Sequence, residues 1–368
     1  MSKSYFSLGL MSGTSADGVD ASIIQSNGDK KYKVILDKYF KYSQSLYQDI
    51  HNLKEQINNS RDLYSLSKKI QPIEKKITLF HANVVKEIIK KFRSNIELVG
   101  FHGQTIFHNA KEKITRQLGD GKLLSKITKK TIIYNFRQND LKNGGHGAPL
   151  TPIFHKLLKK KFKIKEAIFI NIGGITNITN LQKDGRMSGT DVGPGMCLID
   201  RWMRLKLKKN YDNDGKIAKS GKINTKILKK LLKNFYKKEK KLNKGPVQSF
   251  DTKYFDFSFV ENLSLKDGAA TLTEFTVKII ISALRKRKHN KSKIILCGGG
   301  RKNNFLVEKL KREIKGIRLI DQYGVDGDFV ESQAFAYLAI RSYLHLPISF
   351  PETIGVSKSC TGGIIIKN

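Results

Sequence analysis

Hydrophobic and polar residues follow two different patterns along the chain. Short apolar runs bounded by glycine or polar turns are typical of strands, and apolar residues three and four positions apart are typical of helices. The predicted strands are Tyr5–Leu10, Val19–Gln25, Tyr32–Lys38, Ile96–Phe101, Thr131–Phe136, Ala167–Ile172, Ile175–Ile178 and Lys293–Cys297. The predicted helical stretches are Leu46–Phe92, Thr225–Tyr236, Ala269–Arg285, Asn303–Ile314 and Phe329–Leu344. Because strands and helices alternate throughout, the sequence predicts an α/β fold.

A strand, a glycine turn and a second strand follow one another twice in the sequence. The first turn covers residues 13–18 and the second contains Gly173 and Gly174. This repetition is what a duplicated α/β architecture would leave. We therefore expect an N-terminal α/β domain at residues 1–135 and a second α/β domain at residues 136–345, with residues 346–368 packing back on the first.

The composition agrees with a two-domain globular protein. A length of 368 residues suits two domains of ordinary size, and 39% hydrophobic residues exclude a disordered chain. The formal net charge of +37 suggests nucleic acid, a membrane surface or phosphorylated ligands as partners. However, the lysines are spread along the chain, and the densest runs, Lys156–Lys165 and Lys229–Lys244, contain few aromatic residues. We expect no nucleic-acid partner and no membrane partner.

Cysteine usage and hydropathy indicate the compartment. Cys197, Cys297 and Cys360 form no C-x-x-C pair, and their odd number argues against a disulfide framework. No apolar run approaches the roughly 20 residues that span a bilayer. Residues 1–11 lack the cleavage site of a signal peptide and resemble a first strand. These features predict a cytoplasmic protein.

Glycine-rich loops follow the predicted strands at three places. In the loop from Gly13 to Gly18, consecutive N–H groups and the hydroxyls of Thr14 and Ser15 could cradle phosphate oxygens, although the loop is not a Walker motif. Comparable turns occur at residues 173–174 and 298–300. Each turn alone is equally consistent with a tight connection. Together they favour a nucleotide site, because such sites gather at the carboxyl ends of strands.

Asp191 is the best candidate for a general base. We expect Asp191–Gly195 to form a tight loop in which the carboxylate can approach a substrate closely. Phosphoryl transfer needs an acceptor oxygen that a base activates. The alternative role of Asp191 is to cap the helix that follows.

Two polar clusters are expected directly after strands. The first is His102-Gly103-Gln104-Thr105, and the second contains Asn135, Arg137 and Asp140. Such side chains commonly bind hydroxyl and carboxylate groups of a substrate. A structural role for the histidine is the alternative.

These segments together resemble the anhydro-N-acetylmuramic acid kinase family. The matching motifs are G-L-M-S-G-T-S-A-D-G at 9–18, H-G-Q-T at 102–105, N-F-R-Q-N-D at 135–140, N-I-G-G-I-T-N at 171–177, D-V-G-P-G at 191–195, G-G-G-R-K-N at 298–303 and E-S-Q-A-F-A at 331–336. Any one motif is weak evidence, but their occurrence in family order from residue 8 to about residue 363 is specific.

The resemblance implies the two-domain fold of the acetate kinase, sugar kinase, Hsp70 and actin group, with ATP in the interdomain cleft. It implies ATP and Mg²⁺ as cofactors, without identifying the protein ligands of Mg²⁺, and a small-molecule sugar as substrate. The implied reaction converts 1,6-anhydro-N-acetylmuramic acid, ATP and water to N-acetylmuramic acid 6-phosphate and ADP in peptidoglycan recycling.

The resemblance also implies roles for individual residues. Asp191 is expected to be the base, and Glu331 an acid near the sugar. The residues expected to bind ATP are Gly13, Thr14, Ser15, Ala16, Asp17, Gly18, Val19, Asp20, Gly173, Gly174, Gly298, Gly299 and Gly300. The residues expected to bind the sugar are His102, Gln104, Asn135, Arg137 and Asp140.

The chain departs from the family pattern at two places. Val192 and Met196 replace a usual Thr and Asn, which suggests that two polar contacts near the base are missing. The segment from Gln248 to Phe255 keeps the Ser and Phe of a family segment but not its Gly-Arg-Glu.

Three alternative functions stay open at this point. The chain could phosphorylate another sugar, since a fold does not fix its substrate. It could be an ATP-driven conformational protein like Hsp70, which we would expect to carry a long extension after residue 345. It could also be a basic nucleic-acid binder, which predicts tight, salt-dependent binding. The oligomeric state, including a homodimer, is not fixed by the sequence.

Overall fold

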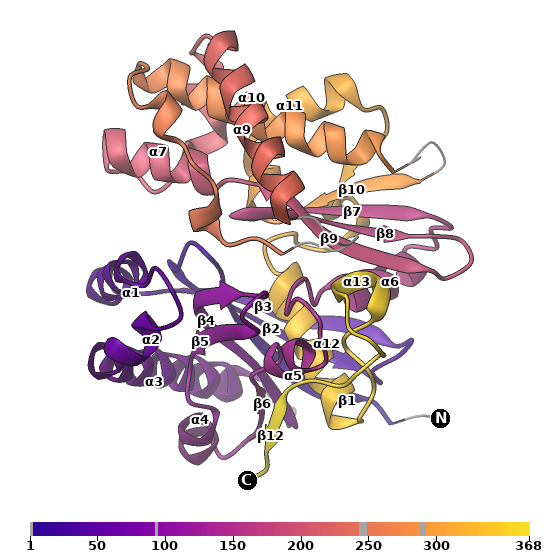
Figure 1. Ribbon diagram of the computed structural model, residues 1–368. Coiled ribbons are helices and arrows are strands. Elements are labelled where there is room, and N and C mark those ends of the chain that lie inside the picture. The colour runs from indigo at the N-terminus through magenta and orange to yellow at the C-terminus, as the bar shows by residue number, and fades with distance from the viewer. Residues whose placement is uncertain (1–2, 93–94, 243–248, 288–291) are drawn as a thin grey trace. The chain divides into compact units, whose positions relative to one another are not determined.

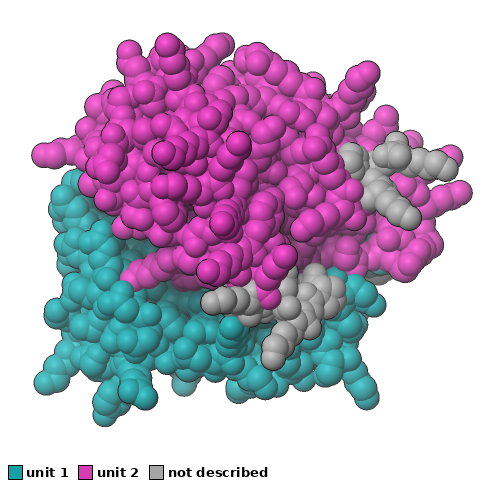
Figure 2. All heavy atoms as spheres, turned by 45° about the horizontal axis from the view of Figure 1, so that its top comes forward, with its two compact units in different colours: residues 1–162, 328–368 teal, residues 163–327 magenta. Residues whose placement is uncertain are grey.

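The chain folds into two compact units. The computed structural model describes residues 3–92, 95–242, 249–287 and 292–368 (Figure 1). Unit 1 comprises residues 1–162 and 328–368, and unit 2 comprises residues 163–327, as coloured in Figure 2. These limits differ from the expected boundaries after residues 135 and 345. They differ because two helices that we had assigned to the second domain, at residues 152–161 and 330–343, pack within unit 1.

Unit 1 is built on a sheet with the order β12-β6-β4-β1-β2-β3, and β5 pairs with β4 at its end. Its strands are β1 (Tyr5–Ser12), β2 (Gly18–Ser26), β3 (Tyr32–Lys41), β4 (Leu98–Asn109), β5 (Ile114–Leu118), β6 (Thr131–Tyr134) and β12 (Ile364–Ile366). The central strand β1 is antiparallel to β2 and parallel to β4, and β4 is parallel to β6. Strand β12 pairs with β6, so the C-terminal segment belongs to unit 1.

Unit 2 repeats this topology in a second sheet with the order β11-β10-β7-β8-β9. Its strands are β7 (Ala167–Ile172), β8 (Ile175–Leu181), β9 (Met187–Pro194), β10 (Lys293–Cys297) and β11 (Ile317–Leu319). The first strand, β7, is again central, with antiparallel strands on one side and parallel strands on the other. The predicted α/β fold with a duplicated architecture is therefore confirmed.

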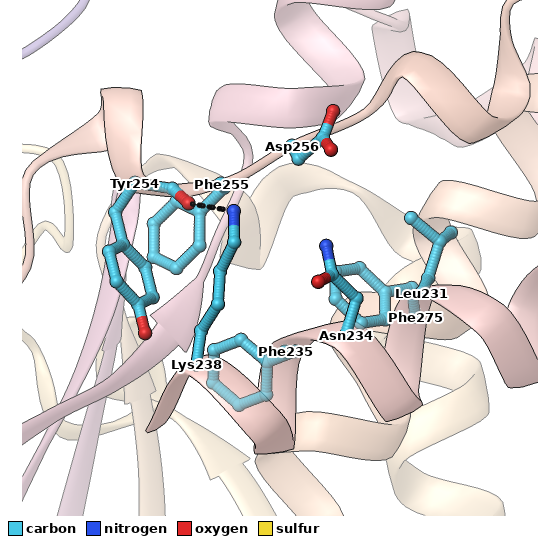
Figure 3. Close-up of a pocket in the computed structure, with 8 residues that line it drawn as sticks. All are labelled: Leu231, Asn234, Phe235, Lys238, Tyr254, Phe255, Asp256 and Phe275. Carbon is cyan, nitrogen blue, oxygen red and sulfur yellow. Dashed lines mark hydrogen bonds between the residues drawn. The ribbon is translucent and has the colours of Figure 1, made fainter. Parts of the chain in front are cut away.

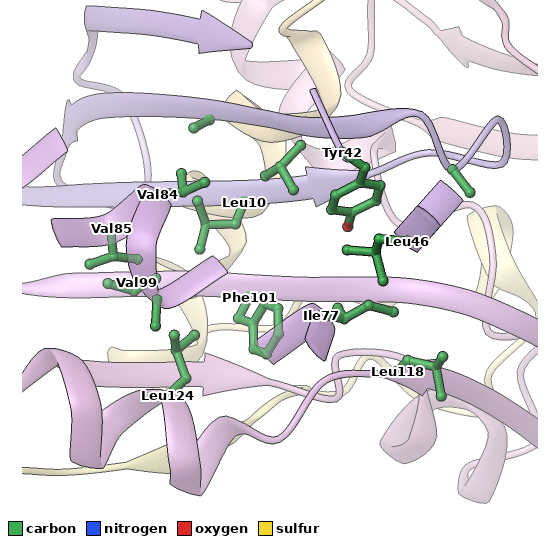
Figure 4. Packing of buried hydrophobic residues seen from close by; sticks show 14 of the residues in the cluster. Leu10, Tyr42, Leu46, Ile77, Val84, Val85, Val99, Phe101, Leu118 and Leu124 are labelled. Atoms are coloured by element: carbon green, nitrogen blue, oxygen red, sulfur yellow. The ribbon is translucent and has the colours of Figure 1, made fainter. Parts of the chain in front are cut away.

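The helices of unit 1 are α1 (Gln44–Gln56), α2 (Asp62–Ser65), α3 (Ser67–Lys91), α4 (Gly121–Thr128), α5 (Gln138–Lys142), α6 (Pro152–Lys161), α12 (Val330–Tyr343) and α13 (Pro351–Ile354). Helix α1 begins after Ser43, whose Oγ accepts a hydrogen bond from the backbone N–H of Leu46 at 3.2 Å. Figure 4 shows its Leu46 near Tyr42 and Ile77 of α3, in one apolar cluster with Leu10 of β1 and Phe101 of β4. Through this apolar cluster, helices α1, α3 and α4 pack on one face of the sheet.

Helix α12 covers the opposite face of the same sheet. Successive strand residues point to opposite faces, so Gly9 and Gly100 face α12 where their neighbours face the cluster of Figure 4. A Cβ at Gly9 would lie 1.9 Å from the carbonyl oxygen of Ser332, and one at Gly100 would lie 2.3 Å from that of Phe335. Glycine at these positions lets the helix backbone approach the sheet directly.

The helices of unit 2 are α7 (Cys197–Leu207), α8 (Lys216–Lys219), α9 (Thr225–Leu242), α10 (Leu265–Arg285) and α11 (Asn304–Glu313). Short 3₁₀ turns occur at Asn213–Gly215, Thr252–Tyr254, Ser258–Val260, Gly299–Lys302 and Ile320–Tyr323. Trp202 of α7 is fully buried, and its indole N–H donates to the carbonyl of Leu265 at 2.9 Å. Within the described part of the chain, we find no helix with the length and apolar character needed to cross a membrane.

Candidate active site

The first glycine loop connects β1 to β2 in unit 1. The N–H of Ala16 donates to the carbonyl of Gly13 at 3.1 Å, and Ala16 has a left-handed φ of 52°. Thr14 and Ser15 are exposed, and a Cβ at Gly13 would approach no closer than 3.9 Å to any neighbour. The loop thus presents its backbone on an accessible surface with room for a ligand.

Gln104 of β4 holds this loop by hydrogen bonds. It is fully buried in β4; its Nε2 donates to the carbonyl of Gly13 at 3.0 Å, and its Oε1 accepts from Ser12 Oγ at 2.6 Å. Tyr42 donates to the same Ser12 hydroxyl at 3.1 Å. Both ends of the Gln104 amide are therefore engaged with the loop, a role that the assignment of Gln104 to the sugar did not include.

His102 and Arg137 form a connected pair in unit 1. The Nε and an Nη of Arg137 donate to His102 Nε2 at 3.1 and 3.0 Å, and His102 Nδ1 donates to the carbonyl of Gly103 at 2.7 Å. Burial, together with the neighbouring guanidinium, holds the pKa of His102 well below its usual value, so the ring is neutral. We had expected residues 102–105 to follow a strand, but they lie inside β4, because pairing with β5 extends this strand to Asn109.

Asp140 continues this chain of contacts. Arg137 donates to the carbonyl of Gly147 at 2.7 Å, and the N–H of Gly147 donates to Asp140 Oδ1 at 2.7 Å. Burial raises the pKa of Asp140, against the opposing effects of hydrogen bonds with Ser349 and with the N–H of Gly147 and of the charge of Arg137. Three of the predicted sugar-binding residues thus belong to one network within unit 1.

Asn135 and Glu331, the remaining residues of unit 1 that were expected near the sugar, lie at element ends. Asn135 follows β6 with a left-handed φ of 57°. Glu331 is half-buried in the first turn of α12, next to Ser332, whose Oγ is 2.6 Å from Ser22 Oγ of β2.

Asp191 lies in a strand, so the expected tight loop at residues 191–195 is wrong. Met187–Pro194 form β9 because they pair with β8, in which Asn177 is opposite Asp191 and also opposite Asn171 of β7. Directly opposed side chains share a face of the sheet, so these three polar residues form a row. Asp191 does not cap helix α7, whose N-cap residue is Met196.

The carboxylate of Asp191 is held by a residue far along the chain. It is only 6% exposed, and its Oδ2 accepts a 2.9 Å hydrogen bond from the backbone N–H of Phe250. Val192 points to the opposite face, where it packs in the core with Ile178. The replacement of Thr by Val therefore contributes to the core and does not remove a contact on the Asp191 face.

Aromatic packing fixes the segment that carries the Phe250 amide. The Phe250 ring lies 6.2 Å from Phe235 of α9 and 5.1 Å from Tyr254. Figure 3 shows Phe235 and Lys238 of α9 facing Tyr254 and Phe255, with the ammonium of Lys238 3.5 Å from the carbonyl of Tyr254. Gln248 is the first residue of the segment that departs from the family pattern, and Lys244 is the last residue of the basic run that begins at Lys229. Both lie outside the described residues.

The two glycine turns of unit 2 meet at neighbouring strand ends. β10 is parallel to β7, and Cys297 is paired with Asn171. Cβ atoms at Gly298 and Gly300 would lie 2.4 Å from Asn171 Oδ1 and 2.3 Å from Ile172 Cγ2 respectively, whereas one at Gly299 would meet nothing within 4 Å. The triple glycine therefore serves close packing at two positions and leaves open space at one.

The turn at Gly173 and Gly174 supports the start of helix α7. The carbonyl of Gly173 accepts from the N–H of Met196 at 2.8 Å, and that of Gly174 accepts from the N–H of Gly195 at 3.0 Å. A Cβ at Gly195 would lie 2.2 Å from the Gly173 carbonyl oxygen. The turn thereby ties the end of β9, with Asp191, to β7.

Several supporting residues escaped prediction. Tyr42 contacts Ser12 and the Phe250 amide contacts Asp191 only because the fold brings distant segments together, and no local motif reveals such contacts. Arg301, which follows the triple glycine, is 4% exposed and donates to both carboxylate oxygens of Asp321 at 2.8 and 2.9 Å. Within residues 3–92, 95–242, 249–287 and 292–368, no group of three or more His, Cys, Asp or Glu side chains is arranged to hold a metal ion.

Comparison with known proteins identifies related chains. The profile of the family described as anhydro-N-acetylmuramic acid kinase matches residues 5–368. A protein of that name from Pelagibacter ubique is 50% identical over 380 aligned positions, covering 100% of both chains. Proteins of the same name from Rhizobium etli and Zymomonas mobilis are 35% and 36% identical, and the alignments cover 97% of this chain and 97% and 98% of the relatives. A solved structure, the component A of a 2-hydroxyglutaryl-CoA dehydratase from Acidaminococcus fermentans, aligns over 92% of this chain and 99% of its own, with a TM-score of 0.46 and 11% identity.

Proposed function

The chain belongs to the anhydro-N-acetylmuramic acid kinase family and is therefore a kinase, and on that premise we propose that it converts 1,6-anhydro-N-acetylmuramic acid, ATP and water to N-acetylmuramic acid 6-phosphate and ADP. This reaction would return a cell-wall sugar to metabolism in peptidoglycan recycling. The observation that carries the proposal is the buried carboxylate of Asp191, fixed by the Phe250 amide in a row with Asn171 and Asn177 beside the glycine turns of unit 2.

The backbone around the glycine loops fits a nucleotide. The open space at Gly13 and the exposed Thr14 and Ser15 leave backbone N–H groups accessible to phosphate oxygens. The open space at Gly299, between β10 and α11, suits the flat surface of adenosine. Mg²⁺ would supply neutralisation of the phosphate charge, with Asp17 of the loop and Asp20 in the first part of β2 as the neighbouring acidic residues.

The chemistry requires one base. Asp191 takes a proton from water, and the water oxygen forms a bond to the anomeric carbon while the bond from that carbon to O6 breaks. O6 then attacks the γ-phosphorus of ATP, and ADP leaves. The amide of Phe250 holds Oδ2 of Asp191 and so helps to orient the carboxylate for this proton transfer.

The polar network of unit 1 suits the sugar. Arg137 carries a positive charge that a neutral His102 does not repel, and a guanidinium pairs well with the carboxylate of a muramic acid. We assign Asn135 and Asp140 to the sugar hydroxyl and amide groups, and Glu331 to an acidic role near the sugar.

A coupled assay of ADP release tests this function. The purified chain is supplied with ATP and Mg²⁺, with and without 1,6-anhydro-N-acetylmuramic acid. We expect release to depend on the sugar, and a phosphorylated sugar with a free anomeric hydroxyl to accumulate with it in equal amount. ADP release that is indifferent to the sugar would refute the substrate. Stimulation by N-acetylmuramic acid instead would show that ring opening is not part of the reaction.

A further inference from the structure

Two side chains of helix α1 donate hydrogen bonds to backbone carbonyls of the glycine loop at residues 13–18. Its His51 donates through Nε2 to the carbonyl of Ser15 at 2.9 Å, and its Lys54 donates through Nζ to the carbonyl of Thr14 at 3.0 Å. With Gln104 on the carbonyl of Gly13, three consecutive carbonyls of the loop accept hydrogen bonds from side chains of the protein.

The direction of these carbonyls fixes the direction of the N–H groups. In a planar trans peptide, the N–H of each residue points opposite to the carbonyl of the residue before it. The carbonyls of Gly13 and Thr14 point to Gln104 and Lys54, so the N–H groups of Thr14 and Ser15 point away from those side chains. Successive N–H groups aimed at one region form an anion-binding concavity.

The two side chains on α1 are themselves held in place. Leu46, Ile50 and Leu53 bury the apolar face of the helix in the core. The ring of Tyr47, one turn before His51, lies 4.3 Å from the His51 ring between centroids. The donors are thus mounted on a rigid helix, and their contacts do not depend on a flexible segment.

We propose that His51 and Lys54 are positioning residues of the loop. Lys54 holds the carbonyl of Thr14, so that the N–H of Ser15 stays turned toward the phosphates of ATP. His51 holds the carbonyl of Ser15, which keeps the N–H of Ala16 on the carbonyl of Gly13 and so keeps the turn closed. This inference rests on the proposed function, because it takes the loop to be the phosphate site. It goes beyond that function by assigning roles to two residues that lie in none of the matched motifs.

A merely structural role makes a different prediction. Lys54 lies in the last turn of α1, where a cation also stabilises the helix terminus. If that were its whole role, Lys54→Ala would lower the melting temperature and leave phosphate binding intact. If Lys54 acted only through its charge, removal of another lysine would have the same effect as its own removal.

Calorimetric binding of ATP and of adenosine to the full chain separates these cases. For His51→Ala and Lys54→Ala, we expect the Kd of ATP to rise about threefold to tenfold for each variant, the effect of one lost hydrogen bond, while the Kd of adenosine stays constant. Lys54→Arg and His51→Gln retain an N–H donor and are expected to bind ATP within about twofold of the unaltered chain. Lys86→Ala, at an exposed position of α3, removes the same charge and is expected to change neither affinity.

Each other result is decisive as well. Equal loss of ATP and adenosine affinity, or an effect of Lys86→Ala as large as that of Lys54→Ala, would overturn the inference. Unchanged ATP affinity in both alanine variants would overturn it directly. If the unaltered chain binds ATP but shows no sugar-dependent turnover, the proposed function fails. The Kd values of the variants for ATP and adenosine would then still test whether His51 and Lys54 position the loop. If the unaltered chain binds no ATP, both fail.

Discussion

The backbone N–H of Phe250 donates a 2.9 Å hydrogen bond to Oδ2 of Asp191, a residue 59 positions earlier in the chain. In the proposed mechanism, this bond holds Oδ2 and helps to orient the carboxylate that would act as the base. The position of this carboxylate therefore depends on the aromatic packing of Phe250 against α9 as much as on the strand that carries Asp191.

Asp191→Asn should abolish turnover while ATP binding survives. The amide is nearly isosteric but cannot accept the proton of water, so we expect kcat to fall by about 10²- to 10⁴-fold. Steady-state ADP release and calorimetric binding of ATP measure the two effects separately. Ser188→Ala, at an exposed position of the same strand, serves as the control. Full activity of the Asn variant would remove Asp191 from the mechanism.

Gln104→Ala should affect ATP more than the sugar. The substitution leaves Ser12 and the Gly13 carbonyl without this partner, which costs about 1–3 kcal/mol of unfolding free energy and loosens the phosphate loop. We therefore expect the KM for ATP to rise and the KM for the sugar to stay nearly constant. An increase confined to the sugar KM would instead support the direct sugar contact expected from the sequence.

Neighbouring glycines in the triple-glycine turn should respond differently to alanine. In Gly300→Ala the new Cβ meets Ile172 at 2.3 Å, so overpacking should lower the free energy of unfolding by about 1–3 kcal/mol. In Gly299→Ala nothing lies within 4 Å, and we expect normal stability with weaker adenosine binding. Urea denaturation and calorimetry compare the pair. Equal stability of the two variants would contradict the packing described here.

Unit 1 should lose stability in acid because of its buried histidines. Burial lowers the pKa of His81 and His108 to about 4 and that of His155 to about 3, and burial with the neighbouring Arg137 also holds the pKa of His102 well below its usual value. The unfolded chain, with ordinary values near 6.5, binds protons first as the pH falls. Stability is therefore complete above pH 6.5 and declines toward pH 4, by up to about 1.4 kcal/mol per pH unit for each histidine.

Urea denaturation at pH 7.5, 6.5 and 5.5 measures this slope. His81→Phe keeps a ring against Phe101 but cannot titrate, so its slope should be smaller by about one proton. A slope that is the same in the variant would exclude His81 as a contributor.

The sequence predicted the parts of the fold whose patterns are local. β1, β2 and β7 were found because they are short apolar runs bounded by glycine or polar turns, and α12 because its apolar residues recur three and four positions apart. β9 was missed because Ser188, Thr190 and Asp191 give it no apolar alternation, and it is a strand only by pairing with β8.

The domain limits could not be read from periodicity either. The pattern of α12 identifies a helix but not the sheet that it covers, which is set by the absence of side chains at Gly9 and Gly100. At the site, motifs identified the loops themselves, whereas the groups that hold them, such as His51 and the Phe250 amide, come from distant positions.

The pairing of β12 with β6, and of α12 with the sheet of unit 1, has a consequence during synthesis. Residues 163–327 leave the ribosome together and can complete unit 2 while translation continues. Residues 1–162 must wait, with the Gly9 and Gly100 face of their sheet uncovered, until residues 328–368 have been made. The nascent chain therefore completes unit 2 first, and the sheet that carries the glycine loop is covered on its second face only after residues 328–368 have been made.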